Sequence, residues 1–404
     1  MKGFKSKHPP KSDYYRLPWS KNDNPIGWLE VTDSCNLYCK GCYREKIEGH
    51  KTLKEIKKEI LFLKKWRNCD NISIAGGEPL IHPDIDKIVE FIAENNIKPV
   101  ILTNGIALNK KRLKELKKSG LAGLTIHIDS LQDRPGWKGK DEKELNKLRQ
   151  HYAEMAKEVK GIYCSFNSTV YYDTFKHIPA MVEWANKNID KVHGMIFITY
   201  RGIPLGKEAE CKAKGAKVDV KKNLPYKIEE LSEINIMSTD VYTIIKNSLK
   251  EYEPSGYLGG TASHDSYKWF NGALIGSKKK IYGSIGKKTM ELIQTFNHIL
   301  QGTYIAYPNL TKTCRKIFLM SMFDKSVRKA FANFIKNPLN LFRRVHLQSI
   351  AIIQAPDLLP DGGQDMCDSC PDMTFYDGKL INSCRLEEYR KYGGFMDFSY
   401  SKRR

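Results

Sequence analysis

The segment Val31–Tyr43, with the sequence VTDSCNLYCKGCY, decides how the chain folds. It holds Cys35, Cys39 and Cys42 in the spacing C-x3-C-x2-C, a density that is unexpected by chance in 404 residues with ten cysteines. Three thiolates can bind three irons of a 4Fe–4S cluster and leave the fourth iron open, whereas four-cysteine clusters normally only transfer electrons. The alternatives are a structural zinc site, which would need a fourth ligand nearby, and a redox C-x2-C pair.

A glycine-rich turn follows about 35 residues later, directly after the apolar run Asn71–Ala75. It reads Gly76-Gly77-Glu78-Pro79. Two glycines at the end of a strand let the backbone approach a ligand closely. Glu78 offers a carboxylate to an ammonium group, and Pro79 stiffens the exit from the turn. Alone this could be an ordinary turn, but after the cysteine motif it indicates a binding site.

Together the two motifs resemble the radical S-adenosylmethionine (radical SAM) superfamily. The resemblance implies a cluster whose open iron chelates the amino and carboxylate groups of SAM, with Glu78 on the ammonium. It also implies a reductant such as flavodoxin or ferredoxin, and cleavage of SAM to a 5′-deoxyadenosyl radical that abstracts hydrogen from a substrate. The residue before the third cysteine is often aromatic in this family and is Gly41 here, so Tyr38 or Tyr43 is expected to contact the adenine.

Strands and helices alternate over residues 24–205, which predicts parallel βα units in an α/β fold. The expected strands are Trp28–Thr32, Ile72–Ala75, Val100–Thr103, Leu124–Asp129, Tyr163–Val170 and Met195–Tyr200. The expected helices are Lys51–Trp66, Pro83–Asn95, Lys110–Lys118, Glu142–Val159 and Phe175–Asn188. Six such units predict a partial (β/α)6 TIM barrel, in which chemistry gathers at the carboxyl ends of the strands.

Polar residues at those strand ends are further candidates. His127 and Asp129 lie two residues apart and face the same side of the fourth strand. The resemblance assigns this region to the ribose or methionine part of SAM, and the alternative is a buried histidine tied to a neighbouring acid. The remaining SAM or substrate candidates are Thr103, Asn104, Asn167 and Arg201.

A second cysteine set lies near the carboxyl terminus. Cys367, Cys370 and Cys384 have the spacing C-x2-C-x13-C, and the turn Tyr376–Lys379 predicts a hairpin that returns Cys384 to the pair. Zinc could use the same arrangement. Downstream of the first motifs, the set resembles the twitch or SPASM auxiliary-cluster domains and implies a second 4Fe–4S cluster. Its spacing is similar to that of the GTP-cyclising enzyme of molybdenum-cofactor biosynthesis, but Pro371-Asp372-Met373 stands where that enzyme has arginines, so the GTP reaction is not carried over.

The net charge of +21 is concentrated in one region. Residues 267–350 hold 15 Lys and Arg against two acids. Basic amphipathic helices are expected over Lys287–Leu300, Lys312–Phe323 and Ser326–Asn337, the last capped by Asp324 and ended by Pro338. Such helices can lie on an anionic membrane surface. Two other readings stay open, a helical subdomain that packs on the barrel, and nucleic-acid binding, for which no RNA-binding motif is present.

The expected domains are an extension (1–23), the radical SAM partial barrel (24–205), a basic, largely helical insertion (206–350) and an auxiliary-cluster domain (351–404). The expected function is hydrogen abstraction from a lipid or isoprenoid chain with an anionic head group, as in lipid biosynthesis. A nucleotide or other soluble phosphorylated metabolite, and a peptide, are the alternatives. Without a signal sequence or an apolar run of 18 residues, the protein is expected in the cytoplasm or peripheral on a membrane.

Overall fold

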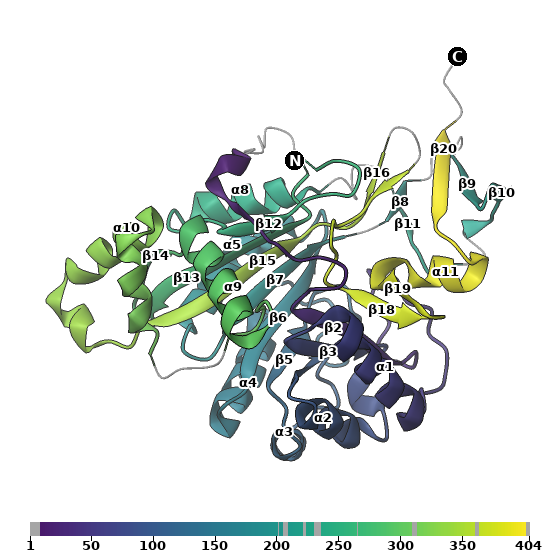
Figure 1. The fold of residues 1–404 in the computed structure, drawn as a ribbon, viewed down its shortest axis with the longest axis horizontal. Coiled ribbons are helices and arrows are strands. Elements are labelled where there is room, and N and C mark those ends of the chain that lie inside the picture. Colours follow the sequence, from purple (N-terminus) through teal and green to yellow (C-terminus); the bar gives the residue numbers. More distant parts are fainter. Residues whose placement is uncertain are drawn as a thin grey trace.

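The computed structural model describes residues 9–200, 202–204, 209–220, 224–229, 236–264, 266–308, 313–359 and 363–400. Within these residues the largest element is a sheet of 13 strands that runs through the centre of the molecule (Figure 1). Its order is β1-β12-β13-β15-β7-β6-β5-β4-β3-β2-β18-β19, and β14 pairs with β13.

Six parallel strands in chain order form the middle of this sheet. They are β2 (Ile26–Thr32), β3 (Asn71–Gly76), β4 (Lys98–Thr103), β5 (Gly123–His127), β6 (Tyr163–Val170) and β7 (Gly194–Thr199). Every residue of β2 and β6 is buried, as expected for parallel strands covered on both faces. The outer edges of β2 and β7 pair with β18 and β15 rather than with each other, so the described sheet stays open. The predicted partial barrel is confirmed.

Five helices connect these strands and cover the outer face of the sheet. They are α1 (Leu53–Arg67), α2 (Ile85–Glu94), α3 (Lys110–Lys118), α4 (Asn146–Val159) and α5 (Ile178–Lys187). In α1, Ile56, Ile60 and Leu63 recur at helical spacing and are fully buried, while Thr52 and Glu55 form a capping box at its start. Short 3-10 helices are η1 (Lys11–Asp13), η2 (Pro79–Ile81) and η3 (Phe175–His177).

The region predicted as a largely helical insertion also extends the sheet. Its described helices are α8 (Ser238–Ser248), α9 (Lys287–Gln301), η4 (Arg315–Met322), α10 (Lys325–Ile335) and η5 (Pro338–Phe342). Its strands are β8 (Ile203–Pro204), just before it, β9 (Ala209–Ala213), β10 (Ala216–Lys217), β11 (Ile228–Glu229), β12 (Gly256–Leu258), β13 (Trp269–Ser277), β14 (Lys280–Ser284) and β15 (His346–Ile353). The helices expected over 287–300 and 326–337 are present, and the third is 3-10.

The strands of this region correct the prediction. β15 joins β7 in parallel as a seventh central strand, and β13 then pairs with it antiparallel. Its alternation of buried residues at Gln348, Ile350 and Ile352 is short and follows a run of basic residues, so the charge pattern favoured helices in the prediction. Pairing with a distant strand, rather than local sequence, decides this conformation.

The carboxyl-terminal part closes the other edge of the sheet. It contains β16 (Asp357–Leu358), β17 (Gln364–Asp365), β18 (Met373–Tyr376), β19 (Lys379–Asn382), η6 (Ser383–Arg385), α11 (Leu386–Tyr392) and β20 (Met396–Tyr400). β18 and β19 form the predicted hairpin, with Asp377 and Gly378 both at positive φ in the turn. β18 pairs in parallel with β2, next to the cysteine loop, while β20 pairs with β9, and the amino-terminal β1 (Tyr15–Arg16) pairs with β12. No helix in the described part of the chain is long and apolar enough to cross a membrane.

Candidate functional site

The cysteine loop after β2 and the glycine-rich turn after β3 are joined through their backbones. The amide of Gly77 donates to the carbonyl of Thr32 at 2.7 Å, and the amide of Glu78 donates to that of Ser34 at 2.8 Å. A Cβ on Gly76 would lie 2.3 Å from the Thr32 oxygen, and one on Gly77 would lie 2.0 Å from the Ser34 oxygen. The two glycines are therefore required for the close approach of the two loops.

Glu78 joins three parts of this edge. Its fully buried carboxylate accepts hydrogen bonds from Thr103 Oγ1 (2.6 Å), the Asn104 amide (2.7 Å) and the Leu80 amide (3.0 Å), and Pro79 begins η2. Burial raises the pKa of Glu78. The carboxylate has no exposed surface and is already used within the chain, so its contact with a SAM ammonium stays a prediction.

The three thiols of the first motif are partly buried. Burial, followed by the neighbouring Asp129, Cys42 and Cys35, raises the pKa of Cys39 to about 12. All ten cysteines lie in the described residues and none forms a disulfide, so the donor chemistry fits an iron–sulfur cluster. No three Cys, His, Asp or Glu side chains of the described chain already stand in a metal-binding arrangement. The assignment of Cys35, Cys39 and Cys42 as ligands stays a prediction.

Three residues of the cysteine loop were candidates for the adenine region. Tyr38 is 75% exposed, and Lys46 Nζ lies 3.6 Å from the centre of its ring. Gly41 donates its amide to the Tyr171 hydroxyl at 3.0 Å, and a Cβ there would lie 2.7 Å from that oxygen. The Tyr43 hydroxyl lies 3.5 Å from Ser383 Oγ in the carboxyl-terminal part. Tyr43 thus connects two parts of the chain, and Tyr38 is the better remaining candidate.

The ends of β4, β5 and β6 reach the same edge. Asn104 Nδ2 donates to Asn36 Oδ1 at 2.6 Å and lies 4.0 Å from Cys35 Sγ. The segments that follow β4 and β2 therefore lie side by side, as expected for the carboxyl ends of parallel strands. His127 Nε2 lies 2.8 Å from Asp129 Oδ2 and 3.2 Å from Thr169 Oγ1.

The histidine tied to an acid is thus present, although the His127 side chain is 31% exposed and Asp129 is fully buried. A SAM contact by the exposed part of the His127 ring stays a prediction. Arg201 lies outside the described residues.

The second cysteine set is held by a residue that no motif indicated. The fully buried guanidinium of Arg67, in the last turn of α1, donates to the carbonyls of Cys370 (2.5 Å) and Pro371 (2.9 Å). It also donates to the carbonyls of Lys21 and Ile26. A hydrogen bond to Cys367 is the largest cause that raises the pKa of the Cys370 thiol, followed by burial.

The hairpin returns the chain towards this pair, because the Ser383 amide donates to the Asp372 carbonyl at 2.8 Å. Cys384 follows directly, so all three cysteines belong to one small region next to β2, and their role as cluster ligands stays a prediction. Cys314 lies beside Val345 at the start of β15, whereas Cys367 bridges to Gly260 near the far end of that strand. Eight strand residues span roughly 25 Å, so Cys314 lies far from the second cysteine set.

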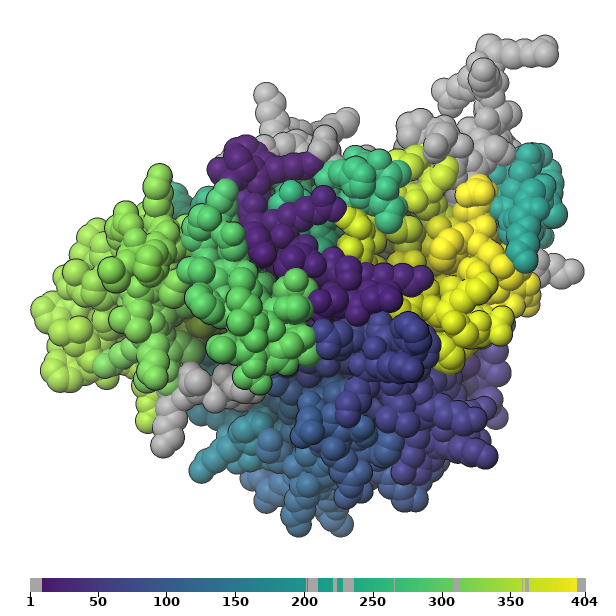
Figure 2. All heavy atoms as spheres, in the orientation of Figure 1, coloured from purple at the N-terminus to yellow at the C-terminus, as the bar shows by residue number. Residues whose placement is uncertain are grey.

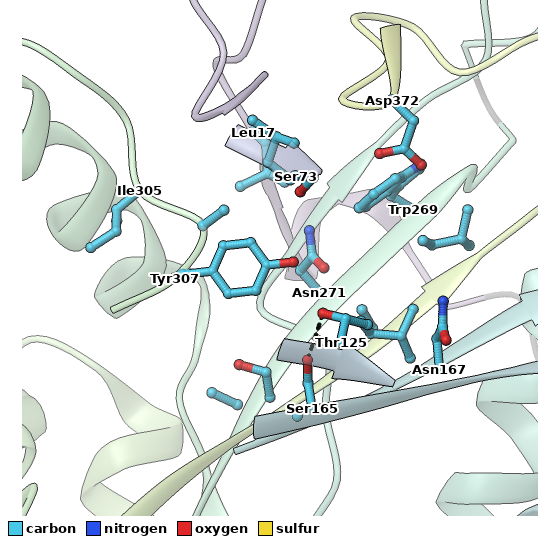
Figure 3. A pocket seen from close by; sticks show the side chains of 18 of the residues that line it. Leu17, Ser73, Thr125, Ser165, Asn167, Trp269, Asn271, Ile305, Tyr307 and Asp372 are labelled. Atoms are coloured by element: carbon cyan, nitrogen blue, oxygen red, sulfur yellow. Dashed lines mark hydrogen bonds between the residues drawn. The ribbon is translucent and has the colours of Figure 1, made fainter. Parts of the chain in front are cut away.

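A cavity of about 170 Å³ lies on the inner face of the sheet (Figure 3). Its apolar walls include Trp28, Leu102, Ile196, Trp269 and Ile353, and its neutral polar groups include Ser73, Thr125, Ser165 and Tyr307. Asn167, a predicted site residue, also lines it. The Oδ1 of Asn167 and the Nε1 of Trp269 are buried without a hydrogen-bond partner among the described atoms. These two unpaired groups could bind a ligand.

One charged residue, Asp372, is present in the described lining of this cavity. Burial raises the pKa of its carboxyl to about 7, although the nearby Arg67 opposes the shift. A second hollow, of about 660 Å³, lies over the cysteine loop. Its lining includes Cys39, Cys42, Lys40 and Lys46, and it is therefore the polar approach to the first motif.

The cysteine loop and the glycine-rich turn both lie within a region that matches a known protein family. Residues 29–185 match the model of the radical SAM superfamily. The chain carries a radical SAM domain. This family uses a 4Fe–4S cluster and SAM, which agrees with the thiols of the cysteine loop.

Individual relatives match only part of this chain. It is 28% identical over 193 residues to a 7,8-dihydro-6-hydroxymethylpterin dimethyltransferase of Methanocaldococcus jannaschii, covering 45% of this chain and 37% of the relative. It is 34% identical over 106 residues to a probable GTP 3′,8-cyclase of Methanococcus maripaludis, covering 26% and 36%. The crystal structure of Streptococcus suis SuiB has a TM-score of 0.41 and 19% identity, with 58% of this chain and 49% of that chain covered. The chain thus spans less than half the length of these relatives.

Proposed function

We propose that the protein reductively cleaves SAM and removes a hydrogen atom from a substrate held in the sheet cavity. The 4Fe–4S cluster, when bound, supplies the electron for that cleavage, and an external one-electron reductant such as flavodoxin or ferredoxin reloads it. Cys35, Cys39 and Cys42 offer the thiols. The turns Gly76–Glu78 and Thr103–Asn104 brace the loop that carries them. A second cluster on Cys367, Cys370 and Cys384 would lie beside the cavity, because Asp372 lines it.

The composition of the cavity wall supports this proposal most directly. The wall is largely apolar, its polar groups are mostly neutral, and Asp372 is the one charge in its described lining. A phosphate group in this cavity would meet a carboxylate and no Lys, Arg or His of that lining, which is unfavourable at low dielectric. The reacting part of the substrate is therefore uncharged or carries hydrogen-bond donors.

The leading substrate class is a lipid or isoprenoid chain whose anionic head group stays outside the cavity. An apolar chain matches the tryptophan and aliphatic walls. The hollow over the cysteine loop is lined by Lys40, Arg44, Lys46 and Lys227 against Glu45 and Asp133, so its net positive charge could attract a head group. Unactivated C–H bonds in such chains also need radical chemistry.

The second candidate is a heterocyclic cofactor precursor, which would be soluble and could be phosphorylated outside its ring. The names of the relatives favour it, since they act on a pterin and on GTP. The unpaired Trp269 Nε1 and Asn167 Oδ1 could bind a ring with one acceptor and one donor. A peptide remains a third class, without a residue of the cavity that favours it.

The test is to identify what the cavity holds. Protein purified without oxygen would be extracted and analysed by mass spectrometry for lipids and for heterocyclic metabolites. Ala351→Phe, which fills the cavity, should lose the enriched molecule but keep SAM cleavage, and Ala107→Phe outside the cavity should lose neither. An enriched long-chain lipid supports the leading class, whereas an enriched pterin or nucleotide shifts the proposal to the second. Equal recovery from Ala351→Phe would remove the cavity as the substrate site.

A further inference from the structure

The segment 313–344, here named the basic lobe, exposes an unusual number of large apolar side chains. It consists of η4, α10 and η5, and it projects from the body of the molecule at the left of Figure 2. Eight large apolar residues are exposed in it, and Met322 and Phe342 are 76% and 86% exposed. The eight are Leu319, Met322, Phe323, Phe331, Ile335, Leu339, Leu341 and Phe342. Scattered apolar residues need no explanation, but a concentration of this size in 32 residues does.

The lobe has already buried the side chains that its fold requires. α10 packs Val327, Ala330 and Phe334 inward, and the ring of Phe334 lies 4.8 Å from that of Phe318 in η4. The predicted helical subdomain is therefore present, because one apolar stripe packs on the body, and a further apolar stripe remains exposed. Most of the exposed apolar side chains lie outside this packed core, while Phe331 also contacts Phe318.

Several of the exposed apolar residues of the basic lobe lie in rows along its helices. Arg328, Phe331 and Ile335 follow one another at helical spacing on the exposed side of α10. In η4, Lys316, Leu319 and Met322 are all exposed and share a ridge, because a 3-10 helix has three residues per turn. The two ridges meet where Arg328 donates to the carbonyls of Ser321 and Met322. Apolar and basic side chains thus share one surface.

The charge of this surface is one-sided. The lobe contains eight Lys and Arg residues and a single acid, Asp324. Asp324 is buried, and its carboxylate accepts the amides of Ser326 and Val327 at the start of α10 and of Thr289 in α9. No exposed acid of the described lobe therefore offsets the positive charge.

We propose that the basic lobe docks on an anionic lipid bilayer. Its apolar side chains would enter the interface between head groups and acyl chains, while the basic residues contact the head groups. A second copy of the lobe would place two surfaces of the same strong positive charge against each other, which disfavours self-association. Nucleic acid would satisfy the charge but leave the apolar side chains in water. This inference stands apart from the substrate proposal, since docking does not depend on what the cavity holds.

The contacts decide which residues to change. Arg328 and Arg315 hold backbone carbonyls inside the lobe, and Arg343 contacts Asn340, so these three are left intact. Lys325, Lys329, Lys336 and Arg344 are exposed and suit reversal to Glu. The matched control reverses four exposed lysines of the barrel helices, Lys58, Lys111, Lys114 and Lys118.

The experiment sediments the full-length protein with vesicles of phosphatidylcholine, with and without phosphatidylglycerol, at low salt. Wild type should bind only the anionic vesicles. The lobe reversals should lower the partition coefficient at least ~100-fold, since each basic residue at such a surface contributes about a factor of five. The control reversals should lower it no more than ~10-fold. SAM cleavage serves as the folding control for all variants.

A second set of variants tests insertion rather than charge. Met322→Ser, Leu339→Ser and Phe342→Ser together keep the net charge and should also lower binding at least ~10-fold. Wild type that ignores anionic vesicles at low salt would overturn the proposal. So would a serine variant that binds vesicles normally but converts a wild-type dimer into a monomer in analytical ultracentrifugation. Binding of a short DNA duplex in place of vesicles would overturn it as well.

Discussion

The barrel half of the molecule and the basic lobe contain similar helices whose apolar residues are buried to different extents. In α1, the apolar residues Ile56, Ile60 and Leu63 form one stripe, and the sheet buries all of it. In α10, a buried stripe through Val327 and Phe334 is accompanied by exposed apolar residues. Both helices are basic and amphipathic in sequence. A buried apolar stripe is explained by folding alone. An additional exposed apolar stripe, as in α10, indicates a binding surface.

The largest expected effect separates the first cysteine motif, in the barrel, from the second cysteine set. Replacing Cys35, Cys39 and Cys42 with Ala should abolish SAM cleavage and leave about half of the roughly eight irons expected in the reconstituted protein. Replacing Cys367, Cys370 and Cys384 should also remove about half of the iron but leave SAM cleavage measurable. Iron assays and 5′-deoxyadenosine detection provide the readouts. Continued 5′-deoxyadenosine production by the first triple variant would contradict the catalytic role of the barrel motif.

Arg67 tests the connection between α1 and the second cysteine set. Arg67→Met should lower the free energy of unfolding by about 3–5 kcal/mol, because four backbone carbonyls, three of them in buried contacts, lose their donor. Arg112→Met, which removes a partly exposed pair with Asp86, should cost at most about 1 kcal/mol. Denaturant titration of the protein without iron measures both. Equal losses would mean that Arg67 adds nothing beyond a surface ion pair.

A matched pair of isoleucines sharpens the comparison between the two helices. Ile60→Ala in α1 should destabilise the protein by about 2–4 kcal/mol, because its side chain is fully buried. Ile335→Ala in α10 should change stability by no more than about 0.5 kcal/mol, because its side chain is 50% exposed. Thermal or urea unfolding gives both values. A loss of 2 kcal/mol or more from Ile335→Ala would show that the exposed stripe serves folding and would weaken the docking proposal.

The smallest effect is a pH dependence in the barrel half. Burial lowers the pKa of His193 to about 4, and its Nδ1 accepts the Cys164 amide at 3.0 Å. The unfolded chain therefore takes up the proton first as the pH falls, so stability is full above about 6.5 and decreases towards pH 4. The decrease should reach about 1–3 kcal/mol, and His193→Gln should show a shallower slope in the same window. Parallel curves for both proteins would contradict this.

Much of the barrel could be predicted because its signals are local. The six parallel strands have short apolar runs with turn residues between them, and the helices between them repeat apolar residues at helical spacing. The turn at Asp377-Gly378 has a specific backbone requirement, so the hairpin was predictable as well. By contrast, β15 was missed because its neighbours in the sheet, β7 and β13, lie far away in the chain.

The candidate site shows the same division. The cysteine spacing and the glycine-rich turn could be predicted from the sequence. The hydrogen bonds from Thr103 and Asn104 to the Glu78 carboxylate could not, since they depend on how two strand ends meet. Tyr171, which requires Gly41 to lack a side chain, comes from 130 residues further along. Arg67 was missed for the same reason, because an arginine in the last turn of a helix usually interacts with solvent.

The amino-acid sequence by itself determined the type of chemistry, the order of the barrel strands and the sign of the charge on the basic lobe. Each of these follows from residue identity at short spacing. Only the tertiary structure decided which apolar side chains remain exposed, which residues line the cavity and how Asp372 comes to lie in its wall. Burial depends on contacts between segments that are far apart in the chain. The periodicity of apolar residues within one segment does not indicate which distant segment it contacts.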